Sequence, residues 1–578
     1  SNAAFAALVA PRPVVAQDTA AVSSTLEVIV VTAQRREQAL QDVPIAIQVV
    51  GNDLLNHVAA EDMGDLNGFV PGLVVSSDSP TQPKYQIRGV QTSDFGVGTD
   101  SAVGVYVDGV YSARSGSSLL AFNDIERIEV LKGPQGTLFG RNSAAGAVSI
   151  VTRQPADEFD GLVRLRLGEN NKRRIDGMVN VPLSDTVALR VNGVWNQSDG
   201  WVQDAATGKD LWPEENWAMR AALKWDITDE TSATLTWDHD QIDQLARPAI
   251  GLVALGPDDT TVPFPPDPAT YLDPLKAPVY NDVIGNEESR KLDAATLFID
   301  HAFSWSDFRS TTAWRTFETV NREDEDGTNR IALYFDTANV EDNTSFYQEF
   351  KLSGQSDAID WVAGVSYYSE DAEQASDTHA FTDSIDTVLR NLGLAGTPDG
   401  TLFGFTSDVL AANGIPLTMR GLPWREVMNN EGTFEATALF GDVIWHATDR
   451  MNVTFGLRYT HDEKEFSWLN GPRQAPELDA TVAALEAGGF FADPAWPIPP
   501  EAYNFDVVFA FPPINGQEIE GQKVKLQDSW DDISPRLVID YRVTSDVMVF
   551  GSLAKGYKAG GFNSVQPLSR FDNEYVWN

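Results

Sequence analysis

The pattern of apolar and polar positions changes near Gly161. Beyond this point apolar residues recur at every second position: Val163, Leu165 and Leu167 alternate with two arginines, and the run 187–196 repeats the pattern. Each run predicts a β-strand with one apolar face and one polar face that contacts solvent. Such apolar faces pack against each other in a soluble sandwich, whereas in a membrane barrel they face lipid.

The connections between these runs favour the barrel. Six tight polar turns each join two runs and predict hairpins, at residues 183–186, 227–230, 305–307, 355–357, 447–450 and 543–546. The other connections are long and mostly acidic, at 197–215, 239–292, 318–343, 369–432 and 462–530. Short turns at one end and long loops at the other are typical of an outer-membrane barrel.

Aromatic side chains near the predicted strand ends support this architecture, because rings gather where a barrel crosses the membrane surface. They are Trp195, Trp217, Trp225, Trp237, Trp305, Trp314, Trp361, Trp445, Tyr367, Tyr459 and Tyr541. The six hairpins and the run at 161–167 give thirteen strands. Bacterial single-chain barrels have an even number of strands and no open edge in lipid. We therefore expect an unclosed sheet that is C-terminally incomplete and ends inside a loop.

Residues 87–153 form a different unit of short strands and glycine turns. Period-2 runs predict strands at 103–107, 128–130 and 148–150, and Asp108-Gly109 is a turn signal. The stretch 133–142 carries three glycines in eight residues, so the backbone turns sharply there. A nucleotide-binding loop needs Lys-Ser/Thr after its last glycine, and Arg141-Asn142 stands there instead.

Four blocks of this unit carry a family resemblance: IRG (87–89), VYVDGVY (105–111), IERIEVLKGPQGTLFGRN (125–142) and AAGAVSIVTR (144–153). They resemble the plug domain of the TonB-dependent outer-membrane receptors. The resemblance implies a mainly β fold, in which an N-terminal α+β plug fills the lumen of a transmembrane antiparallel barrel of 22 strands. It also implies a Gram-negative outer membrane as the location.

The N-terminal run 27–33 is β-prone, and it predicts either an ordinary first strand or an arm that pairs with a partner's sheet edge. It is similar to the TonB box, which in the family pairs with the protein TonB in the periplasm. The resemblance therefore assigns TonB binding to Glu27, Val28, Ile29, Val30, Val31, Thr32 and Ala33.

The chain then divides into four segments. Residues 1–25 combine the apparent cloning scar Ser1-Asn2-Ala3 with a segment that is either a signal-peptide remnant or simply disordered. Residues 26–39 are the TonB box and linker, 40–156 the plug, and 157–578 the incomplete barrel.

Composition narrows the function. Asp and Glu number 84 against 42 Lys and Arg, and the net charge of −42 argues against nucleic-acid binding through a general basic surface. Cysteine is absent, which excludes disulfides and thiolate metal sites. No run of 18 apolar residues occurs, so a chain that spans the membrane has to be a barrel in contact with outer-membrane lipid.

Motifs for catalysis, for a cofactor or for a resident metal are absent from the sequence. The six histidines are scattered, and His446 and His461 lie at opposite predicted strand ends. Residues 323–329 are rich in carboxylates and suit a hard cation such as Ca²⁺. They lack the spacing of a calcium loop, however, and the pattern favours a solvated acidic loop.

Two groups of plug residues are candidates for function. Arg88, Arg127, Arg141 and Arg153 are expected to form ion pairs with the barrel wall, a role that plug arginines have in the family, or else to be solvated on the surface. The loops 91–101 and 111–118 follow predicted strands on the side opposite the arm. Gln91, Phe95, Tyr111 and Arg114 in them are ligand-binding candidates, with plain turn residues as the alternative.

The resemblance implies active import of a scarce small-molecule ligand, driven by TonB. The family takes ferric siderophores, haem, cobalamin, nickel complexes, carbohydrates and aromatic compounds, and we expect a ferric siderophore or another metal chelate first. The alternative is a receptor that signals ligand binding. A passive porin is opposed by the plug, and an enzyme by the lack of a nucleophile and base.

Overall fold

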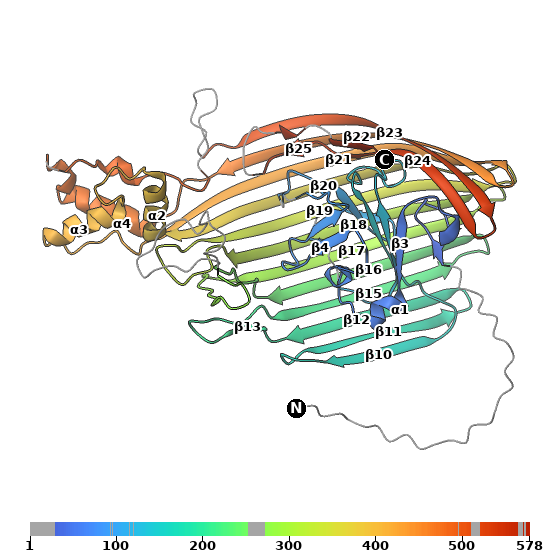
Figure 1. Ribbon diagram of the computed structural model, residues 1–578, viewed down its shortest axis with the longest axis horizontal. Helices are drawn as coiled ribbons and strands as arrows, with labels where there is room; N and C mark the ends of the chain where they lie inside the picture. Colours follow the sequence, from blue (N-terminus) through green and yellow to red (C-terminus); the bar gives the residue numbers. More distant parts are fainter. Residues whose placement is uncertain are drawn as a thin grey trace, which may run out of the picture.

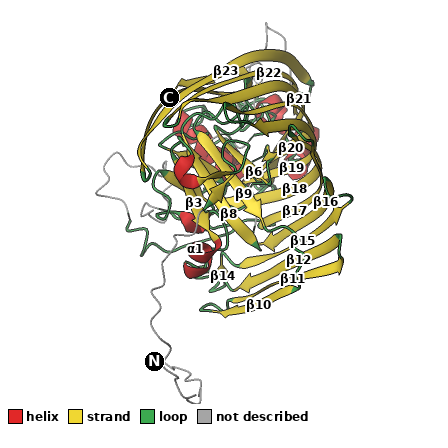
Figure 2. Ribbon diagram, turned by 90° about the vertical axis from the view of Figure 1, so that its right-hand side faces the viewer, coloured by secondary structure: helices red, strands yellow, loops and turns green. Residues whose placement is uncertain are grey.

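The computed structural model describes residues 29–92, 94, 96–114, 116–118, 121–251, 272–494, 496–509, 521–564, 570–571 and 574–577. They form a small α+β part near the N-terminus and a large antiparallel sheet that curves around it (Figure 1). Figure 2 shows the sheet as an open trough with the small part on its concave side. Among the described residues, none of the helices has the length and apolar character needed to cross a membrane.

Fourteen strands of the described chain make the large sheet, and all of them lie in chain order. They are β10 (Asp160–Leu167), β11 (Arg173–Ser184), β12 (Val187–Ser198), β15 (Glu214–Asp226), β16 (Thr231–Gln244), β17 (Glu287–Ala302), β18 (Asp307–Asp324), β19 (Asp336–Gln355), β20 (Ile359–Phe381), β21 (Pro423–Thr448), β22 (Met451–Asn470), β23 (Val524–Thr544), β24 (Val547–Lys558) and β27 (Glu574–Trp577).

The sheet is open, because its first strand β10 and its last strand β27 are edges that do not pair with each other. All six predicted hairpins are present, and the thirteen predicted strands are β10 to β24 of this sheet. The prediction that the chain ends inside a loop is wrong, because residues 574–577 pair antiparallel with β24. Four residues without clear alternation give too little pattern to identify a strand.

The convex side of the sheet carries a continuous apolar band. Leu439, Phe455 and Ile539 expose about half of their surface there or more, while the alternate residues of the same strands are buried against the concave side. Aromatic rings border the band at both ends. Trp195 lies opposite Trp217 toward the loops, and Trp305 stacks with Trp361 beside the tight turns. This is the surface expected of a barrel wall in lipid.

Several strands extend further past the apolar band, toward the loop end, than the sequence predicts. β20 and β21 have 23 and 26 residues, so the connection between them spans 382–422 rather than 369–432. The β18–β19 connection likewise shrinks to 325–335. Outside the lipid the convex face is also polar, as at Glu431 and Glu435. The apolar alternation that identifies a strand therefore stops before the strand does.

Two connections at the loop end fold into one helical cap. It contains α2 (Thr382–Leu392) and α3 (Phe403–Ala412) from the β20–β21 connection, and α4 (Pro476–Ala487), η4 (Phe490–Ala492) and η5 (Pro500–Tyr503) from the β22–β23 connection. Figure 1 shows this cap beyond the end of the sheet. Its core includes Phe403, Trp424 and Tyr503, which are almost fully buried. The sequence predicts long acidic connections at these places but does not indicate the helices within them.

The plug is built on a five-stranded sheet in the order β3 (Ile47–Gly51), β8 (Ile125–Lys132), β9 (Gly146–Thr152), β6 (Val103–Val107) and β7 (Val110–Ser112). β6 and β9 are parallel, and the predicted strands lie inside β6, β8 and β9. The hairpin β4 (Leu73–Ser76) with β5 (Lys84–Ile87), the helix α1 (Asn52–His57), and the short 3-10 helices η1 (Leu40–Asp42) and η2 (Gly64–Leu66) complete it.

Smaller two-stranded pairs lie outside these sheets. β1 (Val30–Val31) pairs with β2 (Gln38–Ala39), β13 (Val202–Gln203) with β14 (Asp210–Leu211), and β25 (Gly561–Phe562) with β26 (Arg570–Phe571). The turn between β6 and β7 has positive φ at Asp108 and Gly109, 49° and 84°. This is the tight hairpin turn that Asp-Gly favours.

Candidate functional site: the plug, its arm and the lumen wall

The arm folds back onto the plug at the tight-turn end of the sheet. Its strand β1 pairs with β2, and Val31 and Ala33 are fully buried. The backbone N–H and the hydroxyl of Thr32 both donate to one oxygen of the buried Glu129 carboxylate, at 2.9 and 3.2 Å. Glu27 and Val28 lie outside the described residues. The arm is thus held by a charged acceptor in the middle of the plug sheet.

Two arginines directly after the arm attach it to the sheet wall. Arg35 lies 3.0 Å from Glu349 on β19, and Arg36 pairs with Asp442 on β21. Between the arm and these arginines, Gln34 is completely buried, and neither its amide nitrogen nor its amide oxygen has a protein partner. A buried amide without hydrogen bonds costs free energy, so the docked arm contains a built-in penalty.

The glycine-rich stretch 133–142 lies against the barrel strands β23 and β24. A Cβ on Gly136 would come within 2.6 Å of the Lys555 carbonyl oxygen and 2.7 Å of the Ser534 hydroxyl. Gly133 and Gly140 have positive φ and make the turns that the sequence predicts. Gly136 has another role, because its missing side chain lets the plug backbone touch the wall.

Arg141 follows this stretch and is buried against the wall. Its guanidinium lies 2.8 Å from Asp462 on β22, and it stacks 4.8 Å above the ring of Tyr368. The hydroxyl of Tyr557 donates to the second oxygen of Asp462 at 2.5 Å. Both carboxylate oxygens therefore have a donor, which is the condition for a buried charge to be tolerated.

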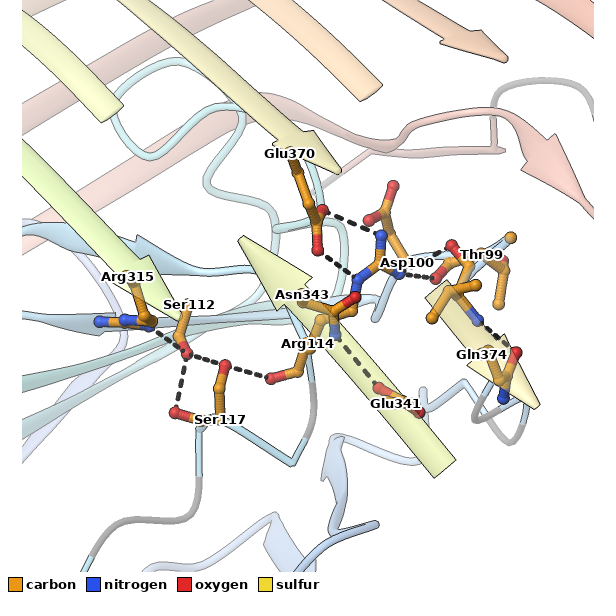
Figure 3. Close-up of polar contacts among 12 residues, drawn as sticks. Thr99, Asp100, Ser112, Arg114, Ser117, Arg315, Glu341, Asn343, Glu370 and Gln374 are labelled. Carbon is orange, nitrogen blue, oxygen red and sulfur yellow. Dashed lines mark hydrogen bonds and ion pairs between the residues drawn. The ribbon is translucent and has the colours of Figure 1, made fainter. Parts of the chain in front are cut away.

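Arg114 makes the second ion pair between plug and wall, and Figure 3 shows its surroundings. Its guanidinium binds both oxygens of Glu370 on β20, at 2.6 and 2.9 Å. A third nitrogen donates to the carbonyl oxygens of Val97 and Thr99, at 2.9 and 3.3 Å. The side chain thus ties the loop 96–101 to the wall.

Asp100, in the same loop, pairs with Lys464 on β22 at 2.5 Å, and both side chains are 2% exposed. Burial raises the pKa of the Asp100 carboxyl, but Lys464, Arg141 and Arg114 outweigh that effect and hold this pKa well below its usual range. Asp100 therefore stays charged. Each of the three cations has its own carboxylate partner: Lys464 pairs with Asp100, Arg141 with Asp462, and Arg114 with Glu370.

Two further ion pairs have the opposite polarity, with the acid on the plug and the arginine on the wall. Asp108 lies 2.6 Å from Arg220 on β15. Arg190 on β12 forms a bidentate ion pair with Asp124, at 2.5 and 2.7 Å. The sequence carried a signal for Arg190, because it occupies the wet face of a predicted strand. Its partner is set only by the docking of the plug.

Of the two expectations for the plug arginines, the ion pair with the wall fails for three of the four among the described residues. Arg127 pairs with Glu126 and Glu129 inside the plug and not with the wall. Arg88 is exposed and Arg153 half-buried, and no ion pair of the described residues joins either to the sheet. Arg88 has positive φ, 52°, beside Gly89, so it belongs to a turn of the plug. Of the predicted set, Arg141 alone is ion-paired with the wall among the described residues.

Two models of known protein families match this sequence. The model of the TonB-dependent receptor plug domain matches residues 39–147. The model of the TonB-dependent receptor-like β-barrel matches residues 224–575, more than half of the chain. The chain belongs to the TonB-dependent receptor family. Its place is accordingly the outer membrane of a Gram-negative bacterium, in agreement with the apolar convex band.

Curated relatives of this receptor match over parts of its length. It is 28% identical over 222 residues to the vitamin B12 transporter BtuB of Vibrio vulnificus, covering 37% of this chain and 35% of the relative. It is 36% identical over 137 residues to the ferrioxamine B receptor of Salmonella typhimurium, covering 23% and 18%. The receptor chain thus spans about a third or less of these curated relatives.

Solved structures share the fold over most of the chain. The ferric yersiniabactin uptake receptor FyuA from Yersinia pestis aligns with a TM-score of 0.65 at 19% identity, covering 92% of this receptor and 68% of that chain. The ferric-catecholate import receptor Fiu from E. coli K12, in its open form, aligns with a TM-score of 0.60 at 14% identity, covering 91% and 72%.

Three of the four predicted ligand residues belong to the described part of the receptor's plug, and they differ in accessibility. Gln91 is exposed, Phe95 lies outside the described residues, and the Tyr111 hydroxyl accepts a hydrogen bond from Asn142 at 3.0 Å. Arg114 is 7% exposed and committed to Glu370. These contacts leave Gln91 the most accessible member of the set that the structure describes.

A small cavity of about 30 Å³ lies beside Arg114, lined by Thr92, Asp94 and the wall residue Glu341. Burial raises the pKa of the Asp94 carboxyl. A site for a drug-sized ligand needs roughly 300 Å³ or more, so this cavity is too small for such a ligand. Sequence reasoning missed three wall residues next to it. The amides of Asn339 and Asn343 donate to the lining residue Glu341, and Gln374 accepts the backbone N–H of Val97 at 3.1 Å. Figure 3 shows Asn343 and Gln374.

Proposed function

We propose that this receptor imports a scarce small molecule across the outer membrane, energised by TonB pairing with residues 27–33. One observation carries the proposal: a single plug spans from the arm at the tight-turn end to the apex loop 96–101 at the other. The arm is held through Glu129 on β8, and the apex through Arg114 and Asp100. Ligand contact and TonB pairing thus act on opposite ends of one plug domain.

The cargo we propose is a ferric siderophore or another metal chelate, because the named relatives include a ferrioxamine B receptor and a vitamin B12 transporter. Carbohydrates and aromatic compounds are the next candidates. Gln91, Tyr111 and Arg114 are the proposed plug contacts, with Phe95 as a fourth from the sequence. Transport rather than catalysis is proposed, since the relatives carry the names of transporters and receptors.

Uptake by a strain lacking its own receptors tests the proposal. Cells carrying the full-length protein are given radiolabelled iron as a panel of hydroxamate and catecholate chelates, and labelled cobalamin in parallel. We expect uptake of at least one compound, abolished by deletion of 27–33 and by removal of TonB. Uptake that persists without the arm refutes TonB-driven import. Binding without uptake, together with ligand-dependent gene induction, establishes the signalling alternative instead.

A further inference from the structure

Three carboxylates converge between two connections at the loop end of the barrel. Asp282 lies in the β16–β17 connection, Asp324 is the last residue of β18, and Asp326 follows it in the β18–β19 connection. One oxygen of each lies within 4.8 Å of the others. Segments 42 residues apart in the sequence therefore bring like charges together, which is unfavourable unless something neutralises them.

Two of these carboxylates have buried oxygens without a donor. Asp324 is 4% exposed; its Oδ1 accepts the backbone N–H groups of Asp326 and Gly327, at 3.0 and 3.2 Å. Its Oδ2 is buried and has no hydrogen-bond partner, and the same is true of Oδ1 of Asp282. Native proteins rarely leave a buried carboxylate oxygen unpaired, so these atoms point to a missing positive partner.

That partner is not a side chain of the described residues. Their ion pairs place no lysine or arginine within 4.0 Å of these three carboxylates; the nearby Arg247 pairs with Glu323 and Asp78 instead. Residues 252–271, outside the described part, contain neither lysine nor arginine in their sequence. The charge of the cluster is therefore left for a proton or a dissolved cation.

We propose that Asp282, Asp324 and Asp326 bind a divalent cation, with Ca²⁺ as the best fit. Calcium binds oxygens at about 2.3–2.6 Å, so two oxygens on opposite sides of the ion are roughly 4.6–5.2 Å apart. The three carboxylate oxygens lie within 4.8 Å of one another, so one ion of this size can contact all three. The donors are carboxylate oxygens without histidine or cysteine, which selects a hard cation over zinc or copper.

The site differs from the one that the sequence suggests. Within 323–329 only Asp324 and Asp326 belong to it, whereas Glu323 pairs with Arg247 and Glu325 accepts the hydroxyl of Thr337. The third carboxylate comes from another connection. A bound ion would thus join the β16–β17 and β18–β19 connections, where Tyr334 already accepts the backbone N–H of Ile284 and donates to Asp336.

Protonation is the competing explanation. Burial, and next the Asp326 carboxylate, raise the pKa of Asp282 to about 7, so part of the cluster would be neutral near neutral pH without a cation. The two explanations differ in one observable: a cation site responds to Ca²⁺ at constant pH, and a protonated cluster does not.

Calorimetric titration with CaCl₂ tests the proposal on the whole receptor, stripped with a chelator and held in detergent free of lipopolysaccharide, which itself binds calcium. We expect one site that the double variant Asp324→Asn, Asp326→Asn weakens at least about tenfold. The matched control is Asp273→Asn, an exposed acid of the β16–β17 connection that pairs with Lys276. It should bind calcium as the unaltered receptor does.

Hydrogen exchange of residues 272–286 and 325–335 provides a second readout that does not depend on the heat of binding. We expect Ca²⁺ to slow exchange in both segments of the unaltered receptor at constant pH, and to have no such effect in the double variant. Equal binding by the double variant places the ion elsewhere and overturns the proposal. Absence of both binding and protection in the unaltered receptor overturns it as well, and it favours protonation.

Discussion

Arg141 of the plug lies 2.8 Å from Asp462 of the wall, and this pair joins positions that are 321 residues apart. Both side chains are buried, with 7% and 0% of their side-chain surface exposed. Such a pair is not a strong source of net stability, but it is costly to break on one side, because the remaining charge stays buried.

The first prediction concerns this asymmetry. Asp462→Ala leaves Arg141 and Tyr557 without their shared acceptor. We expect this change to make the free energy of docking the plug against the wall less favourable by about 3–5 kcal/mol. The double change Arg141→Met, Asp462→Leu should cost much less than the sum, because neither charge remains. Protease sensitivity of the plug in purified receptor measures both. Additive effects would show that the pair does not couple plug and wall.

The second prediction concerns the arm. Glu129→Ala removes the acceptor of both Thr32 hydrogen bonds, which at about 1.5–3 kcal/mol for a charged acceptor corresponds to a roughly tenfold or larger increase in released arm. We expect TonB to bind this variant without ligand. Glu126→Ala is the matched control, because Glu126 also pairs with Arg127 but does not contact Thr32. Unchanged TonB binding by Glu129→Ala would show that the hydrogen bonds between Thr32 and Glu129 do not hold the arm on the plug.

The third prediction acts in the opposite direction. Gln34 is buried without a protein partner for its amide, so Gln34→Met replaces a polar group by an apolar one of similar size. We expect the docked arm to become more stable, hydrogen exchange at 29–33 to slow, and uptake to fall. Faster exchange in this variant would mean that the amide has a partner in the working receptor, such as bound water.

The fourth prediction concerns the helical cap. The carboxylate of Asp386 on α2 accepts the backbone N–H groups of Leu402, Phe403 and Gly404, at 2.6, 3.0 and 2.7 Å, and so caps the start of α3. Asp386→Ala should lower the free energy of unfolding of the helical cap by about 1–2 kcal/mol and increase hydrogen exchange in α3. Asp408→Ala, on the exposed face of α3, is the control. Equal exchange in the two variants would refute the capping role.

The fifth prediction is a pH dependence in the plug. Burial, and next the Asp65 carboxylate, raise the pKa of Asp62 to about 7 from an ordinary value of 3.8. Because the folded pKa is the higher one, the stabilisation is complete below pH 3.8 and is lost as pH rises through about 7. Residues 61–66 should therefore open more at pH 8 than at pH 6. Asp62→Asn should remove this difference, and Asp53→Asn on the exposed surface should not.

Local pattern was sufficient for the strands whose convex face meets lipid, and for the plug strands β6, β8 and β9. The local pattern did not reveal the outer parts of β20 and β21, because both faces of these strands are polar there. It also missed β27, which is too short to show a two-residue period. The cap was missed for a different reason. Its signals are present, with Pro476 at the start of α4 and Gly393 in left-handed conformation after α2. The acidic composition of these connections, however, is equally typical of loops.

The sequence by itself determined the architecture and the family. The two-residue alternation, the short turns that alternate with long connections, and the four sequence blocks within 87–153 that carry the family resemblance are all local features. The tertiary structure decided which charges meet. Arg141 and Arg127 are alike in sequence, yet one reaches Asp462 on the wall and the other stays with Glu129 in the plug. An ion pair depends on the positions of two distant backbones, and the docking of plug into wall, rather than the residues next to each arginine, sets those positions.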